Sequence, residues 1–395
     1  MDTQTPDRVA PSDVRRAPTP RAYPRFDKRD LGQISLVLQG GGALGAYQAG
    51  VYQALDEAGV EPDWVIGTSI GAINAGIIAG NRRENRLPRL REFWHRMRHG
   101  PAMQMAAGIP GWGTMAANAM TVFGGLPGFF RPNSAAFLGL PLTPESAGYY
   151  STAPLKATLL ELIDAEVLNA CTTRLTVGAA NVRTAEMRYF DSRDTPLTIR
   201  HIMASGALPP AFPAVRIDGE LYWDGGILSN TPVEAVFDDK PRRSGLVFTV
   251  NIWQPHGREP RDILGVMSRQ KDLQYASRAT AQVLRQKQLH RLRHVIAELA
   301  QLLPPKLQDS AEVRQLATYG CLTRMHVVRL LAPALAGEDH TKDIDFSAEG
   351  IRNRWEAGYA DTLRVLEQQP WTHEFDPLEG FILHETEAGA ITSEG

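Results

Sequence analysis

Apolar and polar residues follow one another along the chain in blocks that predict an α/β fold. Two short apolar runs, at 34–39 and 63–67, each lead into a glycine-containing turn, as buried strands of a parallel sheet do. The first turn and its helix lie within 40–59, and the second turn precedes a helix at 69–80; both helices have the expected apolar spacing. Because strand and helix alternate, the pattern favours a mainly parallel central sheet.

The same criteria predict further strands and two long helices, and they reveal no internal repeat. The strands are expected at 175–182, 186–191, 246–253 and 325–333, and the helices at 264–303 and 348–366. Ser347 stands directly before the last helix and has the side chain of a typical N-cap.

The two ends of the chain differ from its centre. Residues 1–30 hold five Pro, seven basic and five acidic residues without an apolar run, which predicts a disordered arm and no secretory signal. No window has the roughly 18 apolar residues of an ordinary transmembrane helix. We expect the main folded domain at 31–255 and a mainly helical extension, packed on or beside it, at 256–395.

Composition narrows the class of protein further. The chain has 395 residues and a formal net charge of −2, whereas a dedicated nucleic-acid-binding domain is usually strongly basic. Its two cysteines are too few for a disulfide framework, which favours a reducing compartment and a cytoplasmic location.

Residues 101–130 contain no charged side chain, but six Gly and three Pro interrupt them. Those breakers argue against a membrane span, since they would leave backbone groups unsatisfied in lipid. The segment is either a buried irregular insertion or an apolar lid that contacts an acyl chain. Its candidate contact residues are Met103, Met105, Trp112, Met120, Phe123, Phe129 and Phe130.

A glycine cluster ends the first strand, and its residues are Gly40, Gly41, Gly42, Ala43 and Gly45. Glycines at a strand end that opens a helix let backbone N–H groups converge on a phosphate or on a developing oxyanion. A dinucleotide site would also need an acidic residue at the end of the second strand. Glu61 and Asp63 stand at the start of that strand instead, which argues against nucleotide binding.

A GxSxG motif joins the second strand to its helix, with Ser69 between Gly67 and Gly71. This context is typical of a nucleophile elbow, although Ser69 could instead cap the helix. A serine nucleophile needs a base. No histidine stands in a turn that marks it as that base, and the downstream candidates are His201, His256, His290, His294, His326, His340, His373 and His384.

A different base is available in Asp224, which follows a short strand and precedes Gly225 and Gly226. An Asp-Gly-Gly sequence alone is typical of a plain turn. Together with the glycine cluster and the GxSxG motif, in this order, it resembles the patatin-like phospholipase family, including its bacterial members. The stretch 204–233 also resembles the family's approach to its catalytic Asp, and the resemblance covers about residues 34–255.

The resemblance implies a three-layer α/β/α sandwich with a mainly parallel sheet, followed by a helical C-terminal extension. It implies that Ser69 is the nucleophile of a lipid acyl hydrolase, of the esterase, phospholipase A or lysophospholipase type, with Asp224 as general base. Backbone N–H groups of Gly41, Gly42 and Ala43 would hold the oxyanion, and no cofactor or metal is needed.

The sequence departs from the family at Leu44, where many members carry Arg or Lys. This departure weakens the expectation of an anionic phospholipid and brings in neutral esters, including polyhydroxyalkanoate oligomers. An inactive membrane- or granule-binding protein of the same fold is the alternative of another class. A net charge of +5 between Ser268 and Leu303 predicts a basic helix at 264–303 that either is a solvated face or lies on a membrane or granule surface.

Overall fold

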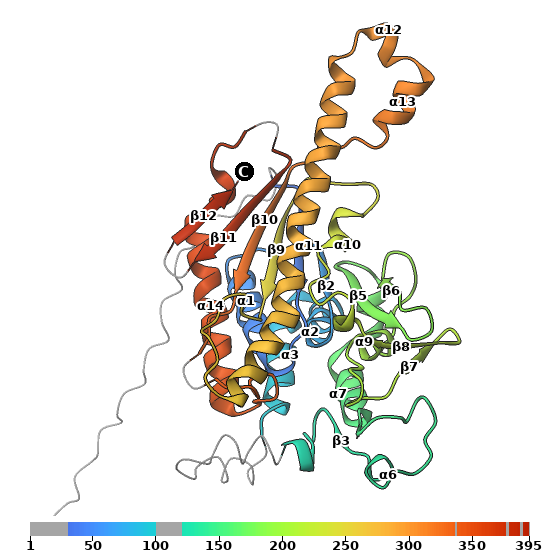
Figure 1. Cartoon of the computed structure of the whole chain (residues 1–395), viewed down its shortest axis with the longest axis vertical. Coiled ribbons are helices and arrows are strands. Elements are labelled where there is room, and N and C mark those ends of the chain that lie inside the picture. Colours follow the sequence, from blue (N-terminus) through green and yellow to red (C-terminus); the bar gives the residue numbers. More distant parts are fainter. Residues whose placement is uncertain (1–30, 100–120, 336–337, 377–378, 388–389, 395) are drawn as a thin grey trace, which may run out of the picture.

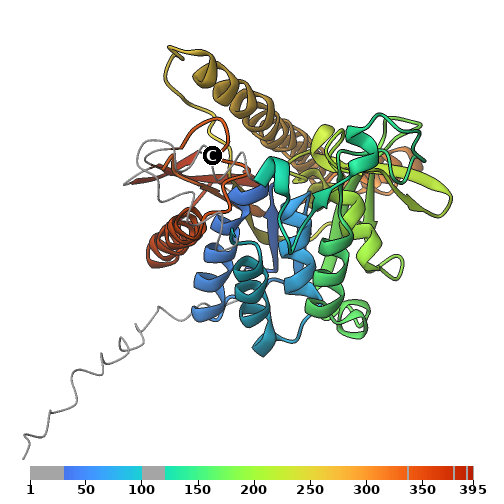
Figure 2. The same cartoon turned by 90° about the horizontal axis from the view of Figure 1, so that it is seen from below.

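The computed structural model describes residues 31–99, 121–335, 338–376, 379–387 and 390–394. The expected arm at 1–30 and most of the charge-free segment 101–130 lie outside these described residues. Within the described part, helices cover both faces of one large sheet (Figures 1 and 2). This arrangement confirms the predicted three-layer α/β/α sandwich.

The centre of the sheet is parallel, as the sequence predicts. Its parallel strands lie in the order β11 (Phe381–Glu387), β10 (Met325–Leu331), β9 (Gly245–Asn251), β1 (Gln33–Leu38), β2 (Trp64–Gly67) and β5 (Arg174–Asn181). In β1, Leu36 faces one core cluster and Val37 faces the other, so both faces of this strand are buried.

Antiparallel strands complete the edges. They are β6 (Met187–Asp191), which pairs with β5, β8 (Glu220–Asp224), β7 (Val215–Ile217) and β12 (Ala390–Glu394). A separate two-stranded sheet joins β3 (Arg131–Pro132) to β4 (Tyr150–Ser151).

The helices contribute to both core clusters. The larger cluster takes side chains from α1 (Ala46–Glu57), α2 (Ile70–Ala79), α3 (Arg83–Arg96), α7 (Ala153–Leu162), α8 (Ala165–Asn169), α9 (Ile199–Ser205) and α14 (Ala348–Gln368). The smaller cluster takes side chains from α10 (Glu234–Phe237) and α11 (Ile263–Leu302). Three short turns of 3-10 helix are η2 (Gly42–Gly45), η3 (Gly225–Ile227) and η4 (Pro370–Thr372).

The C-terminal region is built into the same sandwich. Strand β10 pairs with β9 along its whole length, so the expected boundary at residue 255 does not coincide with a break in the sheet. Helix α14 packs on α1, where Tyr47 donates a hydrogen bond to Asp361 over 2.8 Å. Ser347 caps α14 as predicted, because its hydroxyl accepts a hydrogen bond from the Gly350 N–H.

Helix α11 confirms the long helix predicted at 264–303, and it extends past the sheet (Figure 1). At its far end it carries α12 (Pro305–Gln308) and α13 (Ala311–Ala317). Strand β3 and helix α6 (Ser134–Phe137) lie at the opposite end of the molecule, toward which β9 and β10 point (Figure 1). Among the described helices, none is both long and apolar enough to cross a membrane.

Candidate active site

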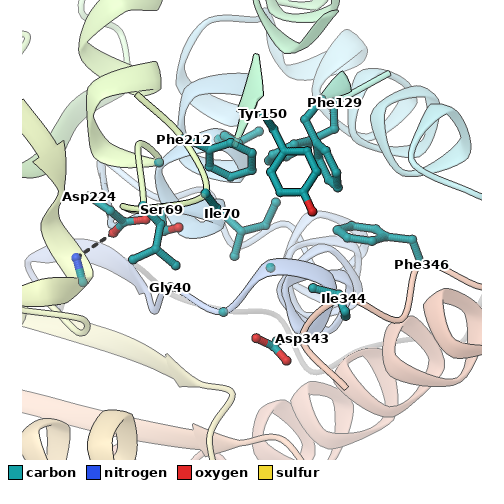
Figure 3. Close-up of a pocket in the computed structure, with 18 of the residues that line it drawn as sticks. Gly40, Ser69, Ile70, Phe129, Tyr150, Phe212, Asp224, Asp343, Ile344 and Phe346 are labelled. Carbon is teal, nitrogen blue, oxygen red and sulfur yellow. Dashed lines mark hydrogen bonds between the residues drawn. The ribbon is translucent and has the colours of Figure 1, made fainter. Parts of the chain in front are cut away.

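The residues that the sequence predicts to carry out the chemistry lie together at the carboxyl ends of the central parallel strands. The glycine cluster follows β1, and Ser69 follows β2, which pairs with β1 in parallel. Asp224 is the last residue of the antiparallel strand β8. A cavity of about 210 Å³ opens at this place, and its lining includes Gly40, Ser69 and Asp224 (Figure 3). Crevices at the carboxyl ends of parallel strands are common ligand sites in α/β folds.

Ser69 occupies a strained turn between β2 and α2. Its φ is 57° and its ψ is −124°, a backbone conformation that a residue with a side chain rarely adopts. The turn is tight because a Cβ on Gly71 would lie 2.2 Å from the Leu38 carbonyl oxygen, and a Cβ on Gly67 would lie 2.3 Å from the Gly71 oxygen. Only glycine fits at both positions, and the strain places the Ser69 side chain at the cavity (Figure 3).

The carboxylate of Asp224 lies beside the Ser69 side chain (Figure 3), and this neighbouring hydroxyl favours the charged form of the carboxylate as a hydrogen-bond donor does. Its Oδ1 also accepts the Gly226 N–H over 2.7 Å. The Asp224 side chain is buried, and the loss of water raises its pKa from 3.8 to about 6, although the Ser69 hydroxyl and the Gly226 N–H favour the charged form. A carboxylate with this pKa is ionised at neutral pH and is still basic enough to accept a proton.

Histidine does not contribute to the described lining of this cavity. His99 contacts one lining residue, since its Nε2 lies 3.0 Å from the hydroxyl of Thr121. His201 is held elsewhere, because its Nδ1 accepts the Thr198 N–H over 2.9 Å at the start of α9. The geometry therefore favours Asp224 over a histidine as the partner of Ser69.

Two backbone N–H groups of the glycine cluster already donate hydrogen bonds to carbonyls of the protein. The Gly40 N–H donates to the Asn230 carbonyl over 3.1 Å, and the Ala43 N–H donates to the Asp343 carbonyl over 2.8 Å. In this conformation Ala43 is therefore not an oxyanion donor, which corrects the expectation for that residue. Gly41 and Gly42, which line the cavity, remain the candidate donors at the start of η2.

The predicted glycines that do not line the cavity include Gly45 and Gly225, and these two contribute to packing and helix geometry. Gly45 is the N-cap of α1, and its carbonyl accepts a hydrogen bond from Asn74 over 3.0 Å. Gly225 packs against the Gly178 backbone under β5, whereas Gly226 reaches the cavity.

Leu44 turns away from Ser69. Its side chain is buried in a different, smaller cavity, whose lining includes Ile252, Lys342 and Arg354. The side chain that replaces the usual Arg or Lys therefore faces α14 and residues 332–335 and 338–342, and it does not line the active-site cavity.

One wall of the active-site cavity is apolar and rich in aromatic rings. The centroid of Phe212 lies 5.9 Å from that of Phe129 and 5.6 Å from that of Phe130. Phe346 continues the wall, with its centroid 6.3 Å from that of Phe129. An acyl chain fits against such a wall because it buries apolar surface there.

The structure tests part of the prediction for the charge-free segment. Phe129 and Phe130 line the cavity, as an acyl-chain wall requires, together with Val122. Phe123 does not line it, and its side chain is 76% exposed. The candidates outside the described residues are Met103, Met105, Trp112 and Met120.

Sequence reasoning missed three residues that shape the site. The Asn230 side chain and the Trp253 indole both donate to the Gly40 carbonyl, over 3.0 and 2.7 Å. Asp343 lines the cavity (Figure 3), its carbonyl accepts the Ala43 N–H, and its carboxylate pairs with Lys271 of α11 over 2.7 Å. The position of Asn230 shortly after the Asp-Gly-Gly motif could have marked it as a site residue, whereas no local sequence pattern marks Trp253 or Asp343.

Comparison with known proteins places this site in a family. The model of the family described as Patatin-like phospholipase matches residues 36–237, and that of a second family, described as Patatin phospholipase, matches residues 273–378. The first match covers more than half of the chain. The chain therefore belongs to the patatin-like phospholipase family, as its motifs indicate, and the second match includes Tyr275, Asp343 and Phe346 of the cavity lining.

Individual relatives are distant and longer. The Lysophospholipase NTE1 of Debaryomyces hansenii is 24% identical over 275 residues, which are 64% of this chain and 15% of that protein. The Patatin-like phospholipase domain-containing protein 7 of Rattus norvegicus is 29% identical over 204 residues, which are 51% of this chain and 12% of that protein. The crystal structure of VipD from Legionella pneumophila matches with a TM-score of 0.35 and 18% identity, covering 85% of this chain and 67% of that one.

Proposed function

We propose that this chain is a lipid acyl hydrolase, of the esterase, phospholipase A or lysophospholipase type, which works through a dyad of Ser69 and Asp224. The observation that carries the proposal is that Ser69, held in a strained turn, lies beside the buried Asp224 carboxylate in the lining of one apolar cavity (Figure 3). A mere helix cap would not need a buried ionisable partner with a raised pKa.

The reaction has two halves. The Ser69 Oγ attacks the ester carbonyl while Asp224 takes its proton, and the N–H groups of Gly41 and Gly42 stabilise the oxyanion, each by ~3 kcal/mol. Asp224 then returns the proton to the leaving alcohol, which leaves an acyl-enzyme on Ser69. In the second half Asp224 removes a proton from water, the hydroxide attacks the acyl-enzyme, and Ser69 recovers its proton as the fatty acid leaves.

The lining favours a neutral or zwitterionic ester over an anionic one. Among the described lining residues there is no Lys, Arg or His, and two are acidic: Asp224, and Asp343, which pairs with Lys271. An anionic group near the scissile bond would be repelled there, because like charges interact strongly at low dielectric. Neutral esters, including polyhydroxyalkanoate oligomers, are for this reason the second candidate substrates.

Hydrolysis of p-nitrophenyl butyrate tests the proposal. We expect kcat to fall at least ~100-fold in both Ser69→Ala and Asp224→Asn, with circular dichroism unchanged. His99→Gln is the matched control and should keep the rate within about threefold. If His99→Gln lost the activity and Asp224→Asn kept it, a serine–histidine mechanism would replace this one. A wild type with no ester hydrolysis would favour an inactive binding protein of the same fold.

A further inference from the structure

Exposed apolar side chains gather beside the mouth of the active-site cavity. They come from three stretches of chain: the residues just before β3, helix α6 with the loop that leads to β4, and the loop after α9. We call them the apolar rim; its members, each between 37% and 76% exposed, are Val122, Phe123, Phe137, Leu138, Leu140, Tyr149 and Leu208.

The apolar rim is continuous with the cavity. Val122 and Leu208 belong to both, since they are exposed and also line the cavity. Tyr150, another lining residue, donates its hydroxyl to the Val122 carbonyl over 2.7 Å, and its ring centroid lies 6.3 Å from that of Phe137. An acyl chain that leaves the cavity therefore passes directly onto apolar side chains.

Charge is scarce along the rim. Between residues 121 and 150 the sequence has two charged residues, Arg131 and Glu145, and Glu145 pairs with Arg216. A surface that is apolar and nearly free of charge suits a lipid surface with zwitterionic headgroups better than it suits a charged partner. Contiguous exposed apolar patches of this kind mark interaction sites.

The basic helix α11, the alternative candidate for a membrane contact, is placed less favourably than the apolar rim. On α11, Arg269 donates to the carbonyls of Gln254 and Pro255, and Lys271 pairs with Asp343. Arg293 pairs with Asp238. The far half of α11 also runs away from the end of the molecule where α6 and β3 lie (Figure 1).

We propose that the apolar rim docks the mouth of the cavity onto a zwitterionic lipid surface, so that a substrate acyl chain moves from that surface into the cavity. The inference rests on the proposed function for the identity of the cavity's ligand. It assigns the contact with lipid to α6 and its neighbouring loops rather than to the cations of α11.

Binding to phosphatidylcholine vesicles tests the proposal, with Ser69→Ala as the background so that no lipid is hydrolysed. In that background, Leu138→Ser with Leu140→Ser should weaken sedimentation with vesicles at least ~10-fold, because both side chains are largely exposed and would bury apolar surface in lipid. The matched control is Leu302→Ser with Leu316→Ser, two exposed leucines at the far end of α11 and on α13, and it should bind like its parent.

Soluble substrate separates this inference from the proposed function. With Ser69 intact, the rim variant should hydrolyse p-nitrophenyl butyrate at the wild-type rate, since neither leucine lines the cavity. Vesicle binding that the rim variant retains, or that Arg285→Gln with Arg291→Gln abolishes instead, would overturn the proposal. So would a dimer that the rim substitutions dissociate, because a second copy would then cover the rim. Absent hydrolysis in the wild type would refute the proposed function, while the vesicle result would still stand.

Discussion

Replacing Asp224 by Asn should remove activity and at the same time make the folded protein more stable at neutral pH. Burial raises the pKa of Asp224 from 3.8 to about 6, so the ionised side chain is less favourable in the folded protein than in the unfolded chain. At about 1.4 kcal/mol per pKa unit, this difference amounts to about 3 kcal/mol. An Asn of the same shape carries no charge, and its carbonyl oxygen can still accept the Gly226 N–H.

The sign of the effect fixes its pH dependence. The free-energy cost of burying the ionised Asp224 lowers the stability of the folded protein in full above pH 6, where Asp224 is ionised in both the folded and the unfolded chain. It shrinks as pH falls from about 6 to 3.8, because the folded protein binds the proton first, and below 3.8 it is gone. We therefore expect Asp224→Asn to exceed the wild type in free energy of unfolding by about 3 kcal/mol at pH 8, and by close to nothing at pH 3.5.

Urea unfolding at pH 8, 6 and 3.5, followed by tryptophan fluorescence, measures this difference. Asp309→Asn is the control, because that carboxylate is 76% exposed and should give no such gain. A less stable Asp224→Asn at pH 8, or a gain that does not change with pH, would refute the reasoning that Asp224 is a base whose ionised form is destabilised by burial.

Four further predictions concern activity and packing. Because Asp224 must be ionised to act as base, kcat/KM for p-nitrophenyl butyrate should rise with pH through an apparent pKa near 6, and a flat profile between pH 5 and 7 would count against it. Phe212→Ala should raise KM about tenfold for a long-chain ester and leave a two-carbon ester unchanged, which a chain-length series below the critical micelle concentrations measures. Asp343→Asn should increase the rate on an anionic ester relative to a neutral one, since it replaces one of the two acidic residues of the lining, and an unchanged ratio would contradict this. Leu44→Arg should lower the free energy of unfolding by about 2 kcal/mol or more in urea titrations, because it places a cation beside Lys342 and Arg354, and wild-type stability would refute this.

The features that could be predicted from the sequence are those whose signal lies within a few neighbouring residues. The apolar run at 34–39, the glycine-flanked Ser69 and the Ser347 cap each carry their signal within a few residues. The same holds for Asp224, whose strand and following glycines are adjacent in the sequence. These features gave the parallel sheet and the two principal candidate residues.

What the sequence did not reveal depends on contacts between distant segments. Asp343 reaches Ala43 across 300 positions, and Trp253 reaches Gly40 across 213, so no local pattern marks either residue. The direction of the Leu44 side chain depends on how α14 packs beside η2. The pairing of β10 with β9, likewise, joins residues 80 positions apart, such as Met325 and Gly245, so it is not visible in the residues of β10 alone.

Covalent labelling with a fluorophosphonate, followed by peptide mass spectrometry at pH 8, tests the central claim most directly. The reagent reacts with an activated serine. We predict one adduct on Ser69 in the wild type, none in Ser69→Ala, and labelling at least ~100-fold slower in Asp224→Asn. An adduct on another serine, or equal labelling rates in the wild type and Asp224→Asn, would contradict the assignment of Ser69 and Asp224 as a catalytic dyad.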